Sequence, residues 1–228
     1  MSKPKLLLLL ILSVAAILGA FYATKNIKKP TKDNKTSANK EIQIDSTSEI
    51  QNGDLIFQTS QSRQCKAIQL ATHSKYSHCG IIYKKGNEFF VFEAVQPVKH
   101  TPLNDWIAHG KDGEYVIKRL KNAKTVLTSE TLKKMRQIGK DFDGKNYDIH
   151  FGWSDEKIYC SELVWKIYQR ATGIEIGKLQ KLGEFDLSHN LVKEILKERY
   201  GDNIPLQEPV ISPVGMFNSD LLITVKEE

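Results

Sequence analysis

The alternation of apolar and polar residues predicts a set of short strands. Segments rich in Ile, Val, Phe and Tyr recur along the chain and are separated by Gly, Asn and Lys. Two of these segments flank a Lys-Lys-Gly-Asn turn, which indicates a β-hairpin. The predicted strands lie at residues 54–57, 78–84, 88–95, 114–120 and 220–225.

Other segments have the helical spacing of apolar residues. In residues 127–144, Thr128 is a suitable N-cap and the apolar side chains share one face. The strongest pattern spans residues 159–173 and ends at Gly173, a natural helix terminator. Shorter helices are predicted at 62–74, 102–110 and 192–201. Strands and helices come in separate groups, so we expect an α+β fold with an antiparallel sheet packed against helices.

The N-terminal part of the chain has a different pattern. Lys3 and Lys5 precede a charge-free run from Leu6 to Thr24. This pattern predicts that residues 1–25 are a secretory signal peptide or an N-terminal membrane anchor, and the sequence does not separate the two. Residues 26–50 are polar and predict a disordered spacer. Residues 51–228 then form one domain, exported to the cell envelope, the periplasm or the exterior, where the anchor would hold it at the membrane.

Charge and cysteine content limit the classes of function. The net charge is +6, and several of the lysines lie in the leader and the spacer, where they suit an anionic lipid surface. No compact basic motif with interleaved aromatics is present, so nucleic acid is not an expected partner. The three cysteines, Cys65, Cys79 and Cys160, form no C-x-x-C pair, and we expect neither a metal nor a cofactor. A Cys65–Cys79 disulfide stays open, because sequence does not give the geometry.

Cys160 falls at the start of the predicted helix 159–173. Unpaired backbone N–H groups and the helix dipole favour an anion there, so the thiol would have a lowered pKa and be nucleophilic. The same N–H groups could stabilise an oxyanion. The alternative interpretation of Cys160 is a small buried apolar side chain.

His78 and Glu93 lie on the two strands of the predicted hairpin. A turn at Lys85-Gly86 places them directly opposite, and a turn at Gly86-Asn87 makes them diagonal neighbours on one face. In either register, the Glu93 carboxylate can orient the imidazole of His78, whereas a three-residue loop would put the two side chains on opposite faces unless a bulge intervened. Cys79 follows His78, so strand alternation directs it to the opposite face.

Together these groups indicate a Cys-His-Glu triad. The motifs "GDLIF", "YSHCGIIY", "VFEAV", "YCSELVWKIY" and "ISPVGMFNSDLLITV" resemble the YiiX-like permuted papain-fold enzymes, relatives of the NlpC-type cell-wall peptidases. The resemblance covers residues 51–225. It implies a circularly permuted papain-like fold, with Cys160 as the nucleophile, His78 as the general base and Glu93 as the third polar residue. Asp54 and Tyr159 match motif positions near the site and would support it.

The first hypothesis for the function is therefore a cysteine hydrolase, an amidase or peptidase that acts on cell-envelope peptides or other amides through an acyl-enzyme. The second is a thioesterase or acyltransferase that uses the same site on lipid-linked acyl groups. The third is a non-catalytic envelope module that retains the fold. The expected partners are thus a peptide, amide or acyl substrate and, through an uncleaved N-terminal segment, the membrane.

Overall fold

The computed structural model describes residues 50–228. The predicted leader and nearly all of the predicted spacer lie outside these residues. Ile50, placed by the prediction at the end of the disordered spacer, is instead buried in an apolar cluster with Ile56 and Ile82. Among the residues described, no helix has the length and apolar character needed to cross a membrane.

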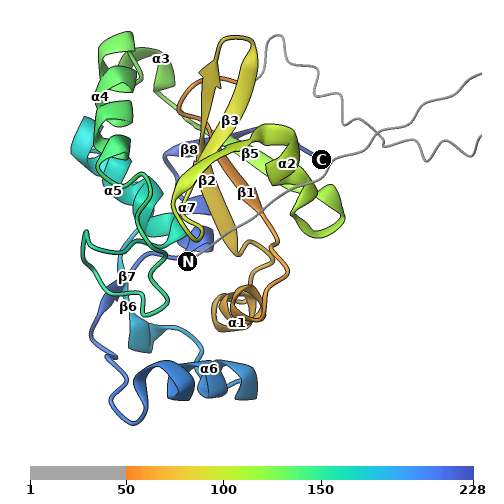
Figure 1. Ribbon diagram of the computed structural model, residues 1–228, viewed down its shortest axis with the longest axis vertical. Helices are drawn as coiled ribbons and strands as arrows, with labels where there is room; N and C mark the ends of the chain where they lie inside the picture. Colours follow the sequence, from red (N-terminus) through yellow and green to blue (C-terminus); the bar gives the residue numbers. More distant parts are fainter. Residues whose placement is uncertain (1–49) are drawn as a thin grey trace, which may run out of the picture. The chain divides into compact units, whose positions relative to one another are not determined.

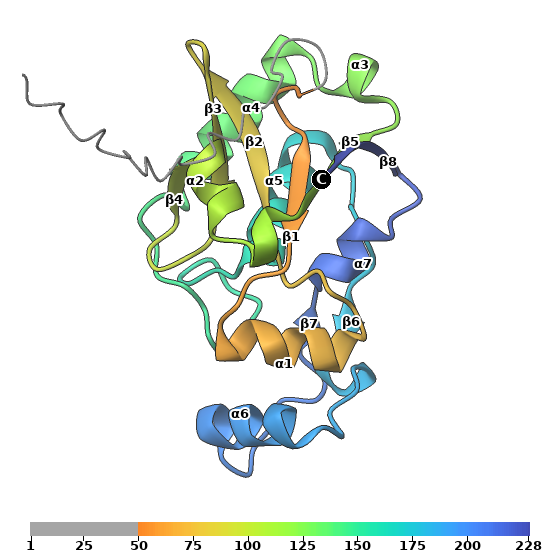
Figure 2. The same ribbon diagram turned by 90° about the vertical axis from the view of Figure 1, so that its right-hand side faces the viewer.

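The centre of the domain is an antiparallel sheet of six strands in the order β4-β3-β2-β1-β5-β8 (Figures 1 and 2). This sheet and the helices packed on it confirm the predicted α+β class. The last strand lies two residues later than expected, and β4 was not predicted. The strands are β1 Leu55–Gln58, β2 His78–Lys85, β3 Glu88–Glu93, β4 Lys99–Pro102, β5 Tyr115–Leu120 and β8 Leu222–Glu227.

The β2–β3 hairpin has the second of the two registers considered above. Lys85 pairs with Glu88, so Gly86 and Asn87 form the turn, and Gly86 has a positive φ of 63°. His78 and Glu93 are therefore diagonal neighbours on one face. Gly80 lies between them along this face, and a Cβ there would be 2.4 Å from Cγ1 of Val91.

Helices cover both faces of the sheet. Helices α4 and α5 lie on one face and α2 on the other (Figures 1 and 2). The observed helices are α1 Arg63–Thr72, α2 Leu103–Ala108, α3 Ala123–Val126, α4 Ser129–Lys140, α5 Cys160–Thr172, α6 Asn190–Tyr200 and α7 Pro213–Phe217, with 3-10 turns η1 Lys111–Gly113 and η2 Leu182–Glu184. The short α3 and α7 were not expected from the sequence.

Helix α5 is the central helix of the core. Every residue from Cys160 to Tyr168 is buried, and the helix ends at Gly173 in the left-handed conformation. A helix buried on all sides is held in place by its surroundings rather than by one amphipathic face. Its N-terminus, and with it Cys160, is therefore fixed relative to the sheet.

Helices α1 and α6 lie side by side beyond one end of the sheet (Figures 1 and 2). Arg63 of α1 forms exposed ion pairs with Glu194 at 3.1 Å and Glu198 at 2.7 Å, both on α6. The short strands β6 Gln180–Lys181 and β7 Pro209–Val210 pair nearby and flank the segment that carries α6. This part of the domain forms one wall of the cavity described below.

Candidate active site

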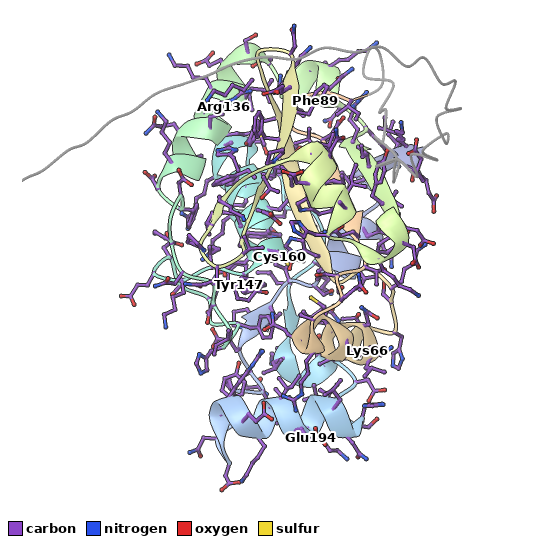
Figure 3. All side chains as sticks on the ribbon, turned by 45° about the vertical axis from the view of Figure 1, so that its right-hand side comes forward. Lys66, Phe89, Arg136, Tyr147, Cys160 and Glu194 are labelled. Carbon is purple, nitrogen blue, oxygen red and sulfur yellow. The ribbon has the colours of Figure 1, made fainter. Side chains whose placement is uncertain are left out.

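Cys160 is the first residue of α5 and is almost completely buried. Tyr159 is the N-cap and has an extended backbone, so the chain enters the helix directly at the cysteine. The first N–H groups of the helix are thus next to the Cys160 sulfur, where they favour a thiolate or an oxyanion. Cys160 lies near the middle of the molecule, beside Tyr147 (Figure 3).

His78 and Glu93 form a buried pair. Nε2 of His78 lies 2.5 Å from Oε2 of Glu93, and the two side chains are only 10% and 5% exposed. Because Nε2 is bound to the carboxylate, the other ring nitrogen, Nδ1, is the one left for Cys160, whose thiol hydrogen-bonds the imidazole. The structure thus brings the three predicted triad residues together.

Two further side chains fix the Glu93 carboxylate. Oγ1 of Thr101, on β4, donates to Oε1 of Glu93 at 2.5 Å, and Nε1 of Trp106, on α2, donates to Oε2 at 2.8 Å. The Trp106 ring also stacks on the His78 ring, with 5.7 Å between centroids. Thr101 and Trp106 were missed in the sequence because they lie on β4 and α2. No local sequence pattern indicates that these two elements contact the hairpin.

The charges of these groups favour an ion pair. Burial acts to lower the pKa of His78, but the bonds to Cys160 and Glu93 outweigh it and raise that pKa well above its ordinary value. Burial acts to raise the pKa of Glu93, but the bonds from His78, Thr101 and Trp106 hold it below its ordinary value. The carboxylate therefore stabilises the imidazolium form of His78.

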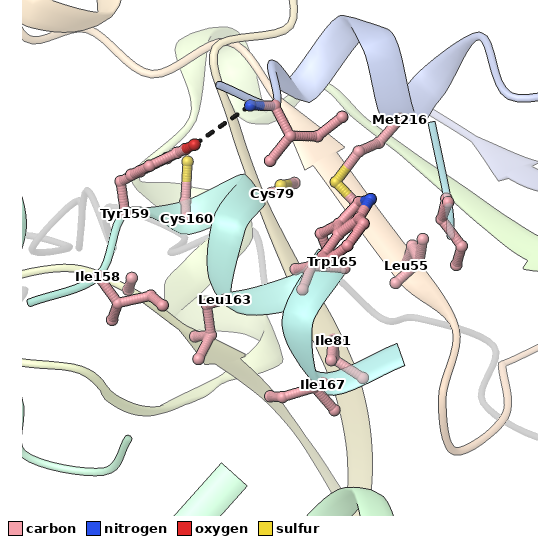
Figure 4. Close-up of a cluster of buried hydrophobic side chains, with 14 of the residues drawn as sticks. Leu55, Cys79, Ile81, Ile158, Tyr159, Cys160, Leu163, Trp165, Ile167 and Met216 are labelled. Atoms are coloured by element: carbon pink, nitrogen blue, oxygen red, sulfur yellow. Dashed lines mark hydrogen bonds between the residues drawn. The ribbon is translucent and has the colours of Figure 1, made fainter. Parts of the chain in front are cut away.

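Cys79 was not expected in the site. It does face away from His78, as strand alternation predicts, but that face carries α5, so Cys79 packs in the same buried cluster as Cys160 (Figure 4). A hydrogen bond from the Cys79 thiol lowers the pKa of Cys160. Burial opposes this effect, and the bond and charge of His78 add to it, so the pKa is well below its ordinary value. All three cysteines of the chain are free thiols, so Cys65 and Cys79 form no disulfide.

Tyr159 lies next to the nucleophile, as the sequence predicted. Its hydroxyl accepts a hydrogen bond of 3.1 Å from the backbone N–H of Ile211 (Figure 4), and its ring meets Phe151 edge to face. Burial raises the pKa of Tyr159 well above its ordinary value. The group is therefore a neutral phenol whose O–H hydrogen can still be donated.

Asp54, the other predicted supporting residue, is not near the triad. Its carboxylate accepts two hydrogen bonds from Arg119, at 2.6 and 2.8 Å, and one from the N–H of Gln51 at 2.7 Å. Its carbonyl oxygen accepts from the N–H of Ile82, four residues along β2 from His78. Four strand residues span about 13 Å. The prediction that Asp54 supports the site is therefore wrong.

An apolar cavity opens beside Cys160. It has about 80 Å³ of free space and lies between α1, α6, the loop at 147–151 and the start of α5. Its walls are almost entirely hydrocarbon, and they include Ala67, Ile68, Phe151, Leu182, Val192 and Ile211. A slender unbranched chain fits such a space better than a bulky or charged group.

A short polar chain borders the same cavity. Arg199 of α6 donates to Oε1 of Gln64 at 2.5 Å, and Nε2 of Gln64 donates to the Tyr147 hydroxyl at 2.8 Å. Tyr147 therefore acts as a hydrogen-bond acceptor toward Gln64 and keeps its own O–H hydrogen. Burial, followed by the negative charge of Cys160, raises the pKa of Tyr147 well above its ordinary value, so it is a neutral donor beside the sulfur. None of the three residues of this chain, Arg199, Gln64 and Tyr147, was singled out in the sequence.

An antiparallel sheet with a histidine strand, packed against a helix that begins at a cysteine, defines the class of papain-like cysteine hydrolases. The family model described as "permuted papain-like amidase enzyme, YaeF/YiiX, C92 family" matches residues 49–226. The chain belongs to this family. The permuted papain-like fold predicted from the sequence is thereby confirmed.

Two relatives are similar over most of the chain. The uncharacterized protein YiiX of Escherichia coli K12 is 53% identical over 178 residues, which are 78% of this chain and 87% of that protein. The crystal structure of YiiX from Escherichia coli O157:H7 has a TM-score of 0.75 and 53% identity, and the match covers 79% of this chain and 98% of that one.

The YiiX crystal structure is described as that of a metalloprotein. In residues 50–228 of the present chain, no group of three or more His, Cys, Asp or Glu side chains is placed to hold a metal ion. No step below involves a metal ion.

Proposed function

We propose that this protein is a cysteine amidase that uses Cys160 as the nucleophile, His78 as the general base and acid, and Glu93 as a positioning residue. The observation that carries the proposal is the buried His78–Glu93 pair, with Nε2 held at 2.5 Å from the carboxylate and Cys160 hydrogen-bonded to the same ring. A buried imidazole oriented in this way next to a thiol at a helix start is suited to acyl transfer.

The reaction follows from the charges of these groups. The Cys160 thiolate attacks the acyl carbonyl, and the new oxyanion faces the N–H groups at the start of α5. When the C–N bond breaks, the imidazolium of His78 gives its proton to the leaving amine. His78 then takes a proton from water, the resulting hydroxide attacks the thioester, and the Cys160 thiolate leaves with the acid as product. Peptides of the cell envelope are the substrate class that we infer from the family and the predicted export.

The test is turnover by the full-length protein in detergent, on a series of acyl 4-nitroanilides and 4-nitrophenyl esters. Cys160→Ala should reduce turnover to the background rate, because no other group can form the acyl-enzyme. Cys65→Ala is the matched control, since Cys65 is a free and partly exposed thiol on α1. Turnover that survives in Cys160→Ala and falls in Cys65→Ala would refute the proposal.

The apolar cavity favours a second candidate, a thioesterase or acyltransferase that acts on lipid-linked acyl groups. The cavity touches Cys160 itself, so an unbranched acyl chain could occupy it while its carbonyl lies at the sulfur. Burial of each further methylene contributes about 0.8 kcal/mol, which corresponds to about fourfold in kcat/KM. Amide and thioester substrates differ only in the group that leaves.

The preferred length of the acyl chain and the group that accepts the acyl group distinguish the amidase from the thioesterase or acyltransferase. If acyl groups occupy the cavity, kcat/KM should rise with each methylene until the space is filled, and Val192→Trp, which narrows it, should shorten the preferred chain. Lys193→Trp, which adds the same ring on the exposed side of α6, is the control. Equal rates for acetyl and decanoyl substrates would exclude the cavity as an acyl site. Transfer of the acyl group to an added amine, faster than hydrolysis, would favour an acyltransferase.

A further inference from the structure

A second cleft lies between α4 and the face of β2, β3 and β4. It has about 330 Å³ of free space, four times that of the cavity at Cys160. Arg136, one of its lining residues, lies toward the hairpin end of the sheet, well away from Cys160 (Figure 3). None of the residues that line the two spaces is shared. The cleft is therefore separate from the candidate active site.

The charge of this cleft is strongly positive. Four cationic side chains line it and one carboxylate, Asp143, opposes them, which gives a formal charge of +3 (4 − 1). The four cations are Lys84, Lys85, Arg136 and Lys140. A concave surface with this excess of positive charge raises the local concentration of anions.

The guanidinium of Arg136 is held in place before any ligand binds. It stacks over the Tyr83 ring at 4.8 Å and donates to Oδ1 of Asn52 at 2.8 Å. These two contacts use only part of its donor set, because a guanidinium has five N–H groups. The remaining N–H groups can bind an oxyanion with little loss of conformational entropy.

Tyr83 carries an unsatisfied hydroxyl at this place. It lines the cleft and is 4% exposed, yet its hydroxyl has no hydrogen-bond partner among the residues that the structure describes. In contrast, the buried hydroxyl of Tyr168 donates to the carbonyl oxygen of Gly53. This hydroxyl is itself buried, so Tyr83 presents its ring to the cleft, and the Arg136 guanidinium lies over that ring.

The neighbouring side chains supply donors and an aromatic surface. Burial raises the pKa of Tyr83, so its hydroxyl stays a neutral donor. Burial also lowers the pKa of His100, whose ring packs 4.5 Å from that of Phe92. Phe90 and Phe92 both line the cleft. The site thus offers cations to one end of a ligand and aromatic rings to the other.

We propose that this basic cleft binds a phosphate monoester with an apolar or planar body, with its oxyanion between Arg136 and Lys140. The phosphate could belong to a soluble organic phosphate or to the headgroup of an anionic lipid, and both present the same chemistry to the cleft. A carboxylate would pair with the same side chains but has fewer acceptor oxygens for this number of donors.

The test is calorimetric titration of the full-length protein in a non-ionic detergent with three probes. Phenyl phosphate represents the soluble source, dihexanoyl phosphatidic acid the lipid source, and inorganic phosphate the oxyanion alone. We expect phenyl phosphate or the lipid to bind at least tenfold more tightly than inorganic phosphate, because the rings of the cleft contact the body of the ligand. The tighter of the two organic probes identifies the source.

The variants make the proposal specific to this cleft. Arg136→Gln removes the guanidinium and should weaken binding about tenfold, whereas Arg136→Lys keeps the charge without the planar fork and should restore only part of the affinity. Lys85→Gln with Lys140→Gln should weaken binding by a similar factor and flatten its salt dependence. The control pair Lys121→Gln with Lys124→Gln removes the same charge from exposed positions elsewhere and should have no effect.

Two results would overturn the proposal: no binding of any probe at millimolar concentration, or equal affinity in Arg136→Gln and the parent protein. Cys160→Ala should bind the probes as the parent does. The result is therefore independent of whether the proposed hydrolase activity is found.

Discussion

Two buried carboxylates, Glu93 and Asp54, have opposite surroundings. Glu93 faces a histidine that can gain and lose a proton, and its pKa is lowered by three hydrogen bonds from side chains. Asp54 faces Arg119, which keeps its charge, and burial raises the pKa of Asp54 in spite of the hydrogen bonds from that guanidinium and from the Gln51 N–H. A carboxylate paired with a fixed charge stabilises the fold, whereas one paired with a titratable ring can take part in proton transfer.

Of the two carboxylates, Glu93 should have the larger effect on turnover when it is replaced. In Glu93→Gln the imidazolium loses its counter-charge, so the pKa of His78 falls, the thiolate loses its cation and the pKa of Cys160 rises. We expect kcat/KM to drop about 1,000-fold. The rate of Cys160 alkylation by iodoacetamide at acid to neutral pH should fall, and its pH dependence should move toward the ordinary thiol pKa of about 8.5. If the pH dependence of Cys160 alkylation is the same in Glu93→Gln as in the parent protein, Glu93 is not part of the site.

The corresponding change at the other carboxylate should act on stability. Asp54→Asn removes the charge of the carboxylate that pairs with the Arg119 guanidinium, which is only 16% exposed. We expect the free energy of unfolding to fall by about 2–3 kcal/mol, since the amide keeps part of the hydrogen bonding. Urea denaturation measures this loss, and kcat/KM of the folded protein should stay within about threefold. A large loss of kcat/KM without destabilisation would mean that Asp54 serves the site after all.

Replacement of Cys79 should have a smaller effect, on the pKa of Cys160. Cys79→Ala removes the thiol that donates to Cys160, so the pKa of Cys160 should rise and its alkylation at pH 7 should slow about threefold to tenfold. Cys79→Ser keeps a donor at the same place and should restore most of the rate. If alanine and serine give the same alkylation profile, the hydrogen bond is not what lowers the pKa.

The smallest expected loss of kcat/KM is that of Thr101→Val. Thr101→Val keeps the shape of the side chain and removes one of the three hydrogen bonds to Glu93. Because His78 and Trp106 still hold the carboxylate, kcat/KM should fall only about twofold to fivefold. A loss as large as that of Glu93→Gln would mean that orientation of the carboxylate matters more than its charge.

These differences also explain what the sequence could predict. The hairpin was predictable because pairing across a short turn follows from residue numbering, and Cys160 was recognised because a helix pattern begins at it. Thr101, Trp106 and Cys79 were missed because they reach the site through β4, α2 and the packing of α5 on β2, none of which has a local signal. Asp54 was misassigned because a motif position does not tell whether a carboxylate faces a histidine or an arginine.

The order of the site residues along the chain sets the time at which the site can form. The His78–Glu93 hairpin precedes Cys160 by 67 residues (160 − 93). At about 5–20 residues per second, a ribosome needs about 3–13 s to add them. During this interval the nascent chain carries the histidine and the carboxylate without the thiol. The proposed nucleophile is the last of the three residues to be synthesised, so a chain that stalls before α5 lacks it.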